Sequence, residues 1–383
     1  MNILVYTQYY PAPKAVRALN DTLVIHYFAK ELQKAGHRVQ VVCVSLSRVQ
    51  FLLKNKFRDI IPTEEDYVYD GVNVHLVRYQ KLKPHESYPD AFQASIINKR
   101  LKKFKQRLGW KPERVFVHFP TSFTGLDEIL ADGVPVLGDF HNFDAYHVLP
   151  RKEGIKAAEF IKKIKNWGYR NVRVYDVLKG IDSREIVRTY SGIDDALLAG
   201  DDFIQEKKQR HNKTMEIVFV GRLLPLKNVD IIIRAVKQLS FACRFTIVGD
   251  GEEMARLREL AQGADNIRFC GMLPRSEAIE EMKKADVFIM ISSPESYGLV
   301  YLEAMAQGCI TIAARGEGFD GIIKDKENGF LRNPGSVEEA MEALNSIHAM
   351  TDVERSEMIA KGYALACSLT EENTARMMLE ANV

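Results

Sequence analysis

The first half of the chain alternates short runs of consecutive apolar residues with segments in which apolar residues recur every three or four positions. Unbroken apolar runs are typical of strands in a parallel sheet with both faces covered, and the longer spacing is typical of an amphipathic helix. The pattern predicts a helix over residues 23–35 that ends at Gly36. It predicts strands at residues 3–6, 39–44, 72–77, 115–118 and 134–138.

The second half repeats this alternation, so two βαβ series predict two doubly wound α/β domains. We place the boundary near Ser191, between an N-terminal domain of residues 1–190 and a C-terminal domain of residues 191–365. A C-terminal helix, residues 366–383, is expected to join the first domain. The pattern predicts strands at residues 216–220, 244–248, 267–270, 287–291 and 310–313, and helices at 229–239, 254–262, 276–285, 298–306 and 337–347.

Length and composition agree with a two-domain cytoplasmic protein. The 383 residues exceed what one hydrophobic core usually holds. No apolar run approaches the roughly 20 residues of a membrane-spanning helix, and the N-terminus has no signal-peptide pattern. The five cysteines include no closely spaced pair, so we expect free thiols in a reducing compartment and neither a disulfide nor a zinc site.

Charge is distributed unevenly between the two halves. Residues 1–190 contain 31 basic and 20 acidic residues, a net charge of +11, and the remainder has 22 basic and 31 acidic residues, a net charge of −9. Lysines and arginines concentrate in residues 99–107 and 160–167. Two interpretations stay open: amphipathic helices with a solvated cationic side, or a surface for anionic lipid or a lipid-diphosphate acceptor. Nucleic acid is not an expected partner, because no recognised binding module accompanies the charge.

The segment from Ser292 to Gly308 joins an expected strand to an expected helix. The first amides of a helix have no partner inside it, and the helix dipole favours an anion there. Gly298 would let a phosphate approach the backbone closely. Glu303 lies about 7.5 Å further along the helix axis, where a carboxylate suits hydroxyl recognition, and Glu295 precedes the helix. The alternative is an ordinary helix start with two solvated glutamates.

Two cations follow another expected strand, in Gly221-Arg222-Leu223-Leu224-Pro225-Leu226-Lys227. Arginine offers a planar fork to phosphate oxygens, and lysine a mobile point charge. Together they could hold a pyrophosphate and stabilise it as a leaving group. Loop cations that are merely solvated are the alternative.

These two segments, in this order and at this separation, resemble the retaining glycosyltransferases of family 4, the glycosyl transferases group 1. That family has the GT-B fold, in which two Rossmann-like doubly wound domains face each other across an interdomain cleft. The resemblance is close over about residues 191–365 and looser over 1–150. Its further matching pieces are Val248-Gly249-Asp250-Gly251, Phe269-Cys270-Gly271, Ala285-Asp286-Val287, Glu303-Ala304-Met305-Ala306 and Asn328-Gly329-Phe330-Leu331.

The resemblance implies a donor site made mainly by the C-terminal domain. Arg222 and Lys227 would bind the donor diphosphate, Glu303 the ribose and Glu295 the hydroxyls of the transferred sugar. The nucleotide base would contact Met272 and Leu273, and the distal phosphate the backbone around Ser296, Tyr297, Gly298, Leu299 and Val300.

In the N-terminal half the resemblance places His141, in Gly138-Asp139-Phe140-His141-Asn142, beside the transferred sugar. His118 is a weaker candidate in the same cleft. Similar enzymes usually have a Gly-Gly pair in the loop after the first strand, whereas residues 11–20 contain no glycine. Lys14, Arg17 or Asn20 are the residues that could compensate.

The resulting hypothesis is a metal-independent, retaining transferase. It would move a hexose-type sugar from a nucleotide-diphosphate sugar, UDP before GDP, to a glycan or lipid-linked acceptor in bacterial surface polysaccharide or glycolipid synthesis. The catalytic candidates are His141, Glu295, Arg222 and Lys227. The nucleotide sugar is a substrate, and no cofactor is expected. The expected location is the cytoplasm, with the inner face of the plasma membrane as a site of peripheral contact. A sugar-nucleotide epimerase of the same fold and a non-catalytic nucleotide-binding protein remain alternatives.

Overall fold

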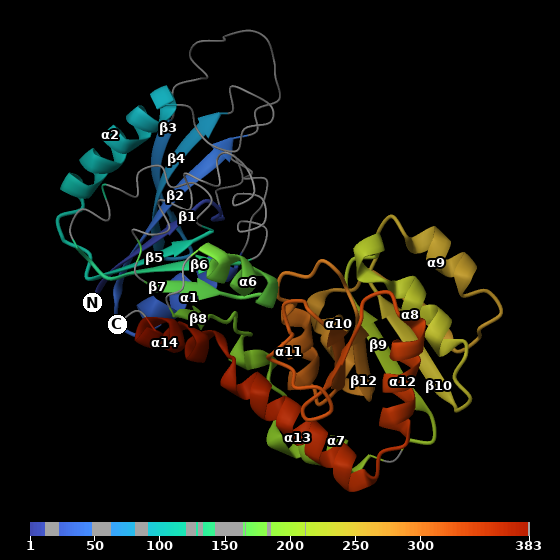
Figure 1. Ribbon diagram of the computed structural model, residues 1–383. Coiled ribbons are helices and arrows are strands. Elements are labelled where there is room, and N and C mark those ends of the chain that lie inside the picture. Colours follow the sequence, from blue (N-terminus) through green and yellow to red (C-terminus); the bar gives the residue numbers. More distant parts are fainter. Residues whose placement is uncertain are drawn as a thin grey trace. The chain divides into compact units, whose positions relative to one another are not determined.

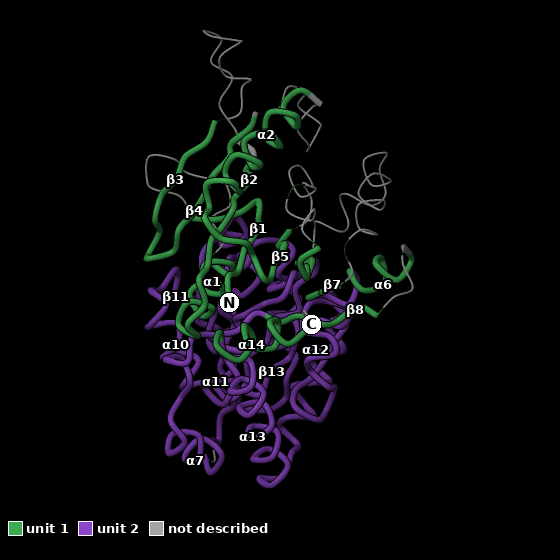
Figure 2. Tube along the Cα trace, turned by 90° about the vertical axis from the view of Figure 1, so that its left-hand side faces the viewer, with its two compact units in different colours: residues 1–170, 174–190, 371–383 green, residues 171–173, 191–370 purple. Residues whose placement is uncertain are grey.

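The computed structural model describes residues 1–11, 23–47, 63–80, 91–119, 128, 133–141, 164, 166–181, 185–210 and 212–381 (Figure 1). The chain divides into two compact units, shown in Figure 2. Unit 1 contains residues 1–170, 174–190 and 371–383, and unit 2 contains residues 171–173 and 191–370. The chain therefore returns from unit 2 to unit 1 between residues 370 and 371, five residues after the boundary at 365/366 that the sequence predicts.

Unit 1 is built on an eight-stranded sheet of order β3-β4-β2-β1-β5-β6-β7-β8. Its strands pair in parallel except β3, which runs antiparallel to β4. The five predicted strands are confirmed, whereas β3, β7 and β8 were missed because β3 is a largely exposed polar strand and the other two are short. The strands are β1 (Asn2–Thr7), β2 (Arg38–Ser47), β3 (Thr63–Tyr69), β4 (Val72–Gln80), β5 (Arg114–His118), β6 (Val136–Phe140), β7 (Asn166–Tyr169) and β8 (Ile186–Arg188).

Helices pack on the sheet of unit 1 through two separate apolar clusters. Alternate residues of β1 belong to different clusters. Ile3 and Val5 belong to the first cluster, and Leu4 and Tyr6 belong to the second. Strand side chains alternate between the two faces of a sheet, so β1 is covered on both, which explains its unbroken apolar run. The first cluster includes α1 (Val24–Lys34) and α14 (Glu371–Ala381), and the second α2 (Ala91–Arg107) and α6 (Val172–Ile181).

Unit 2 has a six-stranded, all-parallel sheet of order β11-β10-β9-β12-β13-β14. Strands β10 and β11 are added on one side of β9, and β12, β13 and β14 on its other side. The switch point therefore lies between β9 and β12, and open α/β sheets bind ligands at such a point, beyond the carboxyl ends of their strands. Five of the strands are predicted ones. The strands are β9 (Met215–Val220), β10 (Cys243–Val248), β11 (Ile267–Gly271), β12 (Val287–Met290), β13 (Ile310–Ala314) and β14 (Phe330–Arg332).

All five predicted helices of unit 2 are confirmed, with ends that differ by at most three residues. The sequence pattern missed α7 and α13, and α13 runs without a break through the expected boundary at 365/366. The helices are α7 (Asp201–Gln209), α8 (Val229–Val236), α9 (Met254–Leu260), α10 (Arg275–Lys284), α11 (Leu299–Ala306), α12 (Val337–His348) and α13 (Asp352–Ser368).

Two smaller observations concern the cysteines and the helices. The five cysteines are free thiols, as expected. Within the described residues, no helix combines the length and the apolar character needed to cross a bilayer.

Candidate functional site

The loops that follow β9 and β12 are joined to each other. Ser293 donates its backbone N–H to the carbonyl oxygen of Leu226 at 2.9 Å, and the Asn228 side chain donates to the carbonyl of Ile291 at 2.8 Å. Because β9 and β12 are neighbours in the sheet, these bonds hold together the two loops that contain the predicted donor-binding residues Arg222, Lys227 and Glu295.

Within these loops, Lys227 and Glu295 form an ion pair. Lys227 Nζ lies 2.6 Å from Glu295 Oε2, and Ser292 Oγ donates to the same oxygen at 2.8 Å. Both side chains are largely covered, with 17% of Lys227 and 13% of Glu295 exposed. The cation predicted to hold a diphosphate and the acid predicted to bind sugar hydroxyls therefore sit side by side.

Helix α11 begins beside this pair. Its N-cap, Gly298, has a φ of +87° and makes no side-chain capping bond. A Cβ atom at this position would lie 2.4 Å from Cε2 of Tyr301, and positive φ disfavours other residues as well. The helix start therefore requires a glycine at the place where the sequence predicts close approach of a phosphate.

Two further predicted donor residues of unit 2, Arg222 and Glu303, differ in their surroundings. Arg222 is exposed, and its guanidinium has no hydrogen-bond or ion-pair partner among the described residues. Glu303 Oε1, by contrast, lies 2.5 Å from Nη2 of Arg275. Arg275 is the first residue of α10 and was missed by the sequence analysis. It follows closely on Met272, which is 75% exposed, and Leu273, which is half-buried.

A further missed residue is Glu317, in the loop after β13. It is 1% exposed, and its two carboxylate oxygens accept hydrogen bonds from Ser293 Oγ at 2.6 Å and from the backbone N–H of Glu295 at 2.9 Å. No pattern in the sequence relates residue 317 to residue 295, because the contact depends on β12 and β13 lying next to each other.

In unit 1, the predicted His141 belongs to a buried cluster at the carboxyl ends of β5 and β6. Asp139 Oδ2 lies 3.1 Å from both His118 Nδ1 and His141 Nε2. Arg170 donates to the same oxygen at 2.7 and 2.9 Å, and Thr189 Oγ1 donates to Asp139 Oδ1 at 2.5 Å. The ring of Phe119 stacks on His141 with the centroids 3.9 Å apart.

Burial and charge set the protonation of this cluster. Burial lowers the pKa of His141 to about 3, and the positive charge of Arg170 adds to the shift. Burial likewise lowers the pKa of His118. For Asp139, burial opposes ionisation, but Arg170 and the two histidines outweigh it and hold its pKa well below the usual range. Near neutral pH the cluster therefore contains an ionised Asp139, a cationic Arg170 and two neutral imidazoles.

The ligand atoms of His118, Asp139 and His141 lie within 4.8 Å of one another, a grouping that could hold a metal ion. However, Arg170 already places a positive charge against Asp139 Oδ2. A metal ion there would be repelled by the guanidinium or would have to displace it. We therefore interpret the group as a hydrogen-bonded ion-pair cluster that holds His141 in place.

Some predicted residues lie outside the described part of the chain. These are Lys14, Arg17 and Asn20 of the first loop, and most of the second basic stretch. The first basic stretch lies on α2, whose Ile97, Leu101 and Phe104 are buried in the core while Lys99, Lys102, Lys103 and Arg107 are exposed.

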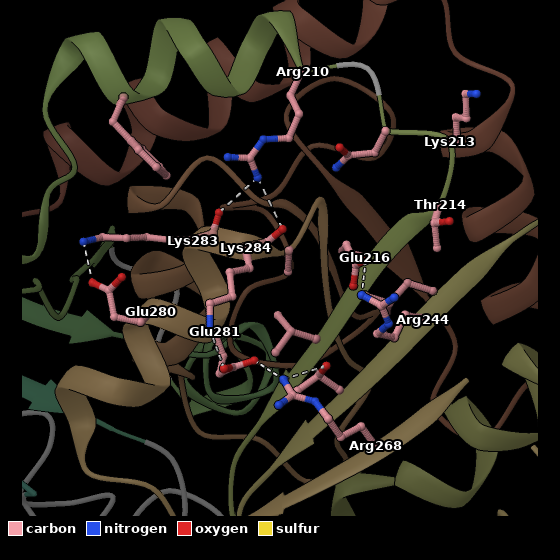
Figure 3. A pocket seen from close by; sticks show the side chains of 16 residues that line it. Arg210, Lys213, Thr214, Glu216, Arg244, Arg268, Glu280, Glu281, Lys283 and Lys284 are labelled. Atoms are coloured by element: carbon pink, nitrogen blue, oxygen red, sulfur yellow. Dashed lines mark hydrogen bonds and ion pairs between the residues drawn. The ribbon is translucent and has the colours of Figure 1, made fainter. Parts of the chain in front are cut away.

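A large cavity of about 880 Å³ lies elsewhere in unit 2 (Figure 3). It is lined by residues near the amino ends of strands, among them Glu216, Arg244 and Arg268, and by α10. Its charges largely pair with one another: Arg244 with Glu216 at 2.8 Å, Arg268 with Glu281, and Lys283 with Glu280 at 2.7 Å. Its lining shares no residue with the predicted donor site.

Comparison with known proteins gives a family match for the C-terminal part. Residues 201–364 match the family model described as Glycosyl transferases group 1. Sulfoquinovosyl transferase SQD2 of Arabidopsis thaliana is 34% identical over 148 residues, which cover 38% of this chain and 28% of that protein. The lipopolysaccharide core biosynthesis glycosyltransferase LpsE of Rhizobium meliloti is 31% identical over 150 residues, 38% of this chain and 43% of that protein. The alignments thus span less than half of either relative.

Solved structures resemble the whole chain. The lipopolysaccharide outer core galactosyltransferase WaaB in its apo form superposes with a TM-score of 0.69 at 12% identity, covering 100% of this chain and 99% of that chain. Anabaena Alr3699/HepE in complex with UDP gives 0.68 at 16% identity, covering 99% of each. Likeness at this level of identity concerns the fold, and it confirms the predicted GT-B architecture of two α/β sheets.

Proposed function

We infer that this chain, whose residues 201–364 match the family model of the glycosyl transferases group 1, is a retaining glycosyltransferase that uses a nucleotide sugar. The observation that carries this proposal is the arrangement at the tip of α11. There Lys227 and Glu295 lie 2.6 Å apart, in loops that both belong to the matched segment. The proposed reaction moves a hexose-type sugar to a glycan or lipid-linked acceptor of bacterial surface polysaccharide or glycolipid synthesis.

The structural neighbours support UDP as the first nucleotide to test, with GDP next. Alr3699/HepE has been solved in complex with UDP-glucose, and a trehalose-6-phosphate protein of E. coli with UDP-2-fluoro glucose. For the acceptor, the names of SQD2 and LpsE point to glycolipid and lipopolysaccharide products.

The proposed chemistry follows from where charge develops. Breaking the bond between sugar and diphosphate builds positive charge at the anomeric carbon and negative charge on the leaving phosphate. Arg222, Lys227 and the first amides of α11 would stabilise the leaving group. The acceptor hydroxyl would attack on the face from which the diphosphate departs and pass its proton to the leaving phosphate oxygen, so that the configuration is retained.

The remaining residues would position the donor. Glu295 would bind hydroxyls of the transferred sugar. Glu303, which forms an ion pair with Arg275, would bind the ribose. His141 is neutral in its cluster, so it would exchange hydrogen bonds with the sugar without adding charge. Because Arg222, Lys227 and the helix dipole supply the positive charge at the leaving group, we propose that the reaction needs no metal ion.

We also propose peripheral contact between α2 and an anionic membrane. The apolar side of α2 packs in the core of unit 1, whereas Lys99, Lys102 and Lys103 are exposed, which supports electrostatic attraction rather than insertion. The free cysteines support a reducing, cytoplasmic location for this contact.

The deciding experiment is a thermal-shift screen with UDP-, GDP- and ADP-sugars, since a ligand that binds the folded state raises its stability. The donor with the largest shift is then incubated with the protein and acceptor extracts, with and without EDTA. Transfer that persists in EDTA and gives a retained linkage supports the proposal. Interconversion of the sugar without an acceptor would identify an epimerase, and stabilisation without turnover a nucleotide-binding protein. No shift with any nucleotide sugar would contradict the proposal.

A further inference from the structure

The carboxylate of Glu317 holds the loop that carries Glu295. One oxygen accepts the Glu295 backbone N–H at 2.9 Å and the other accepts the Ser293 hydroxyl at 2.6 Å. The next residue contributes as well, because the Gly318 N–H donates to the Glu295 carbonyl oxygen at 3.3 Å. Both backbone polar groups of Glu295 are thus bound by two consecutive residues of the loop after β13.

The two loops also approach too closely for most other residues. A Cβ atom on Gly318 would lie 2.4 Å from Cα of Tyr297 and 2.5 Å from the carbonyl oxygen of Ser296. Arg173, which groups with unit 2, places Nη2 2.5 Å from Glu317 Oε1 and balances its charge. With 1% of its surface exposed, Glu317 is buried.

Two neighbouring serines of this loop bind different carboxylates. Ser292 donates to the side chain of Glu295 at 2.8 Å, whereas Ser293 donates to Glu317 at 2.6 Å. The carboxylate of Glu295 is therefore fixed from one side by Ser292 and Lys227, and its backbone is fixed from the other side by Glu317. A displacement of a catalytic group by about 1 Å can lower a rate by a factor of about 100, so such an anchor bears directly on function.

We propose that Glu317 is a positioning residue for recognition of the transferred sugar, acting through the backbone of Glu295. The proposal rests on the proposed function, in which Glu295 contacts sugar hydroxyls and Lys227 the diphosphate. Because Glu317 holds Glu295 and forms no hydrogen bond or ion pair with Arg222 or Lys227, its loss weakens the sugar-dependent part of donor binding and leaves nucleotide binding in place.

The test compares dissociation constants for UDP and for UDP-glucose, or for the nucleotide sugar selected by the screen above, together with the transfer rate. In the wild type the sugar adds affinity beyond UDP. Glu317→Ala is expected to keep the UDP constant within about twofold, to lose the extra affinity of the sugar, and to slow transfer about tenfold. Glu317→Gln is expected to restore most of the activity, because its amide oxygen can still accept the Glu295 N–H.

Glu339→Ala is the matched control. Glu339 also accepts a backbone N–H, from Asn333 at 2.8 Å, but it anchors a loop at the start of α12. Its substitution is expected to leave the ratio of the UDP dissociation constant to the UDP-glucose dissociation constant unchanged. If Glu317→Ala does not fold, Ser293→Ala removes one of the two contacts within the same loop and is expected to lower the ratio in the same direction.

The outcomes separate this proposal from the function on which it rests. A Glu317→Ala protein that loses affinity for UDP and UDP-glucose by the same factor, or that keeps both the ratio and the rate, overturns the positioning role while the glycosyltransferase stands. A wild type that binds UDP-glucose no more tightly than UDP also overturns the positioning role, because Glu295 would then not contact the sugar. A wild type that binds no nucleotide at all contradicts the proposed function itself.

Discussion

Lys227 Nζ lies 2.6 Å from Glu295 Oε2, although the two residues are 68 positions apart in the sequence. A charged pair this well covered is more strongly coupled than one on the surface, because water screens it less. In the absence of a donor the acid thus neutralises the cation. A diphosphate arriving at Lys227 would share its charge and leave Glu295 freer to accept hydrogen bonds from sugar hydroxyls.

The first prediction concerns this pair. Lys227→Ala and Glu295→Gln are each expected to slow transfer at least tenfold, which corresponds to about 1.4 kcal/mol of barrier. Steady-state rates with the donor from the screen would measure this. Lys361→Ala removes an exposed lysine of the same unit and serves as the control. Full activity in both Lys227→Ala and Glu295→Gln would mean that the site lies elsewhere.

Arg222 gives a second prediction, because its guanidinium is exposed and makes no ion pair with any described residue. Arg222→Ala should leave the melting temperature of the ligand-free protein unchanged, since the charge has no ion pair with a described residue to lose. It should weaken UDP binding about tenfold, because a charge-assisted contact to the diphosphate disappears. Titration calorimetry would measure the affinity. An unchanged UDP constant would remove Arg222 from the donor site.

A third prediction separates backbone strain from steric exclusion at the helix tip. Gly298 has a φ of +87° and no room for a Cβ atom, whereas Gly335 has a φ of +83° with no atom within 4 Å of the Cβ position. Gly335→Ala should therefore cost only the backbone penalty of about 1–2 kcal/mol. Gly298→Ala should lower the free energy of unfolding, measured in urea, by more than this amount, and it should weaken UDP binding as well. Equal losses of stability with unchanged UDP affinity in both variants would contradict a phosphate site at Gly298.

The fourth prediction is a dependence of stability on pH. Burial lowers the pKa of His141 to about 3, below its unfolded value of about 6.5. The folded protein then binds this proton more weakly than the unfolded chain, so stability is complete above pH 6.5 and is lost as the pH falls toward 3. Asp139, with its lowered pKa, adds a loss below about pH 4.

Urea unfolding at pH 7.5 and pH 5 would measure this effect. The wild type is expected to lose up to about 1.4 kcal/mol per pH unit through His141, and His141→Asn should lose less over the same interval. A pH response that is identical in the two proteins would show that His141 does not stay neutral in the fold.

The fifth prediction concerns the exposed lysines of α2. Lys102→Glu combined with Lys103→Glu should reduce binding to vesicles that contain anionic lipid by at least about tenfold, since each basic residue near such a surface contributes about 1 kcal/mol. Co-sedimentation at low and high salt would measure it. Lys324→Glu with Lys361→Glu makes the same change of charge on exposed positions of unit 2. Equal loss in both double variants would mean that only net charge matters.

The amino-acid pattern was enough to predict the fold class and the kinds of residue in the candidate site. Apolar runs revealed most of the strands because parallel strands are buried on both faces, and helical spacing revealed α8 and α10. Gly298, Lys227 and Glu295 were identified because they follow buried strands, and the carboxyl ends of such strands meet at one edge of a sheet. The largely exposed strand β3 left no such pattern, so it was missed.

Which side chains contact one another could be seen only in the folded chain. Arg275 with Glu303, Glu317 with the Glu295 backbone, and Arg170 with Asp139 are contacts between residues that are remote in sequence. Each depends on the order of strands in a sheet and on the path of a loop, which local patterns of apolar and polar residues do not encode. Periodicity reports which face of an element is buried, whereas the partner of a buried charge is chosen by the packing of elements that are distant along the chain.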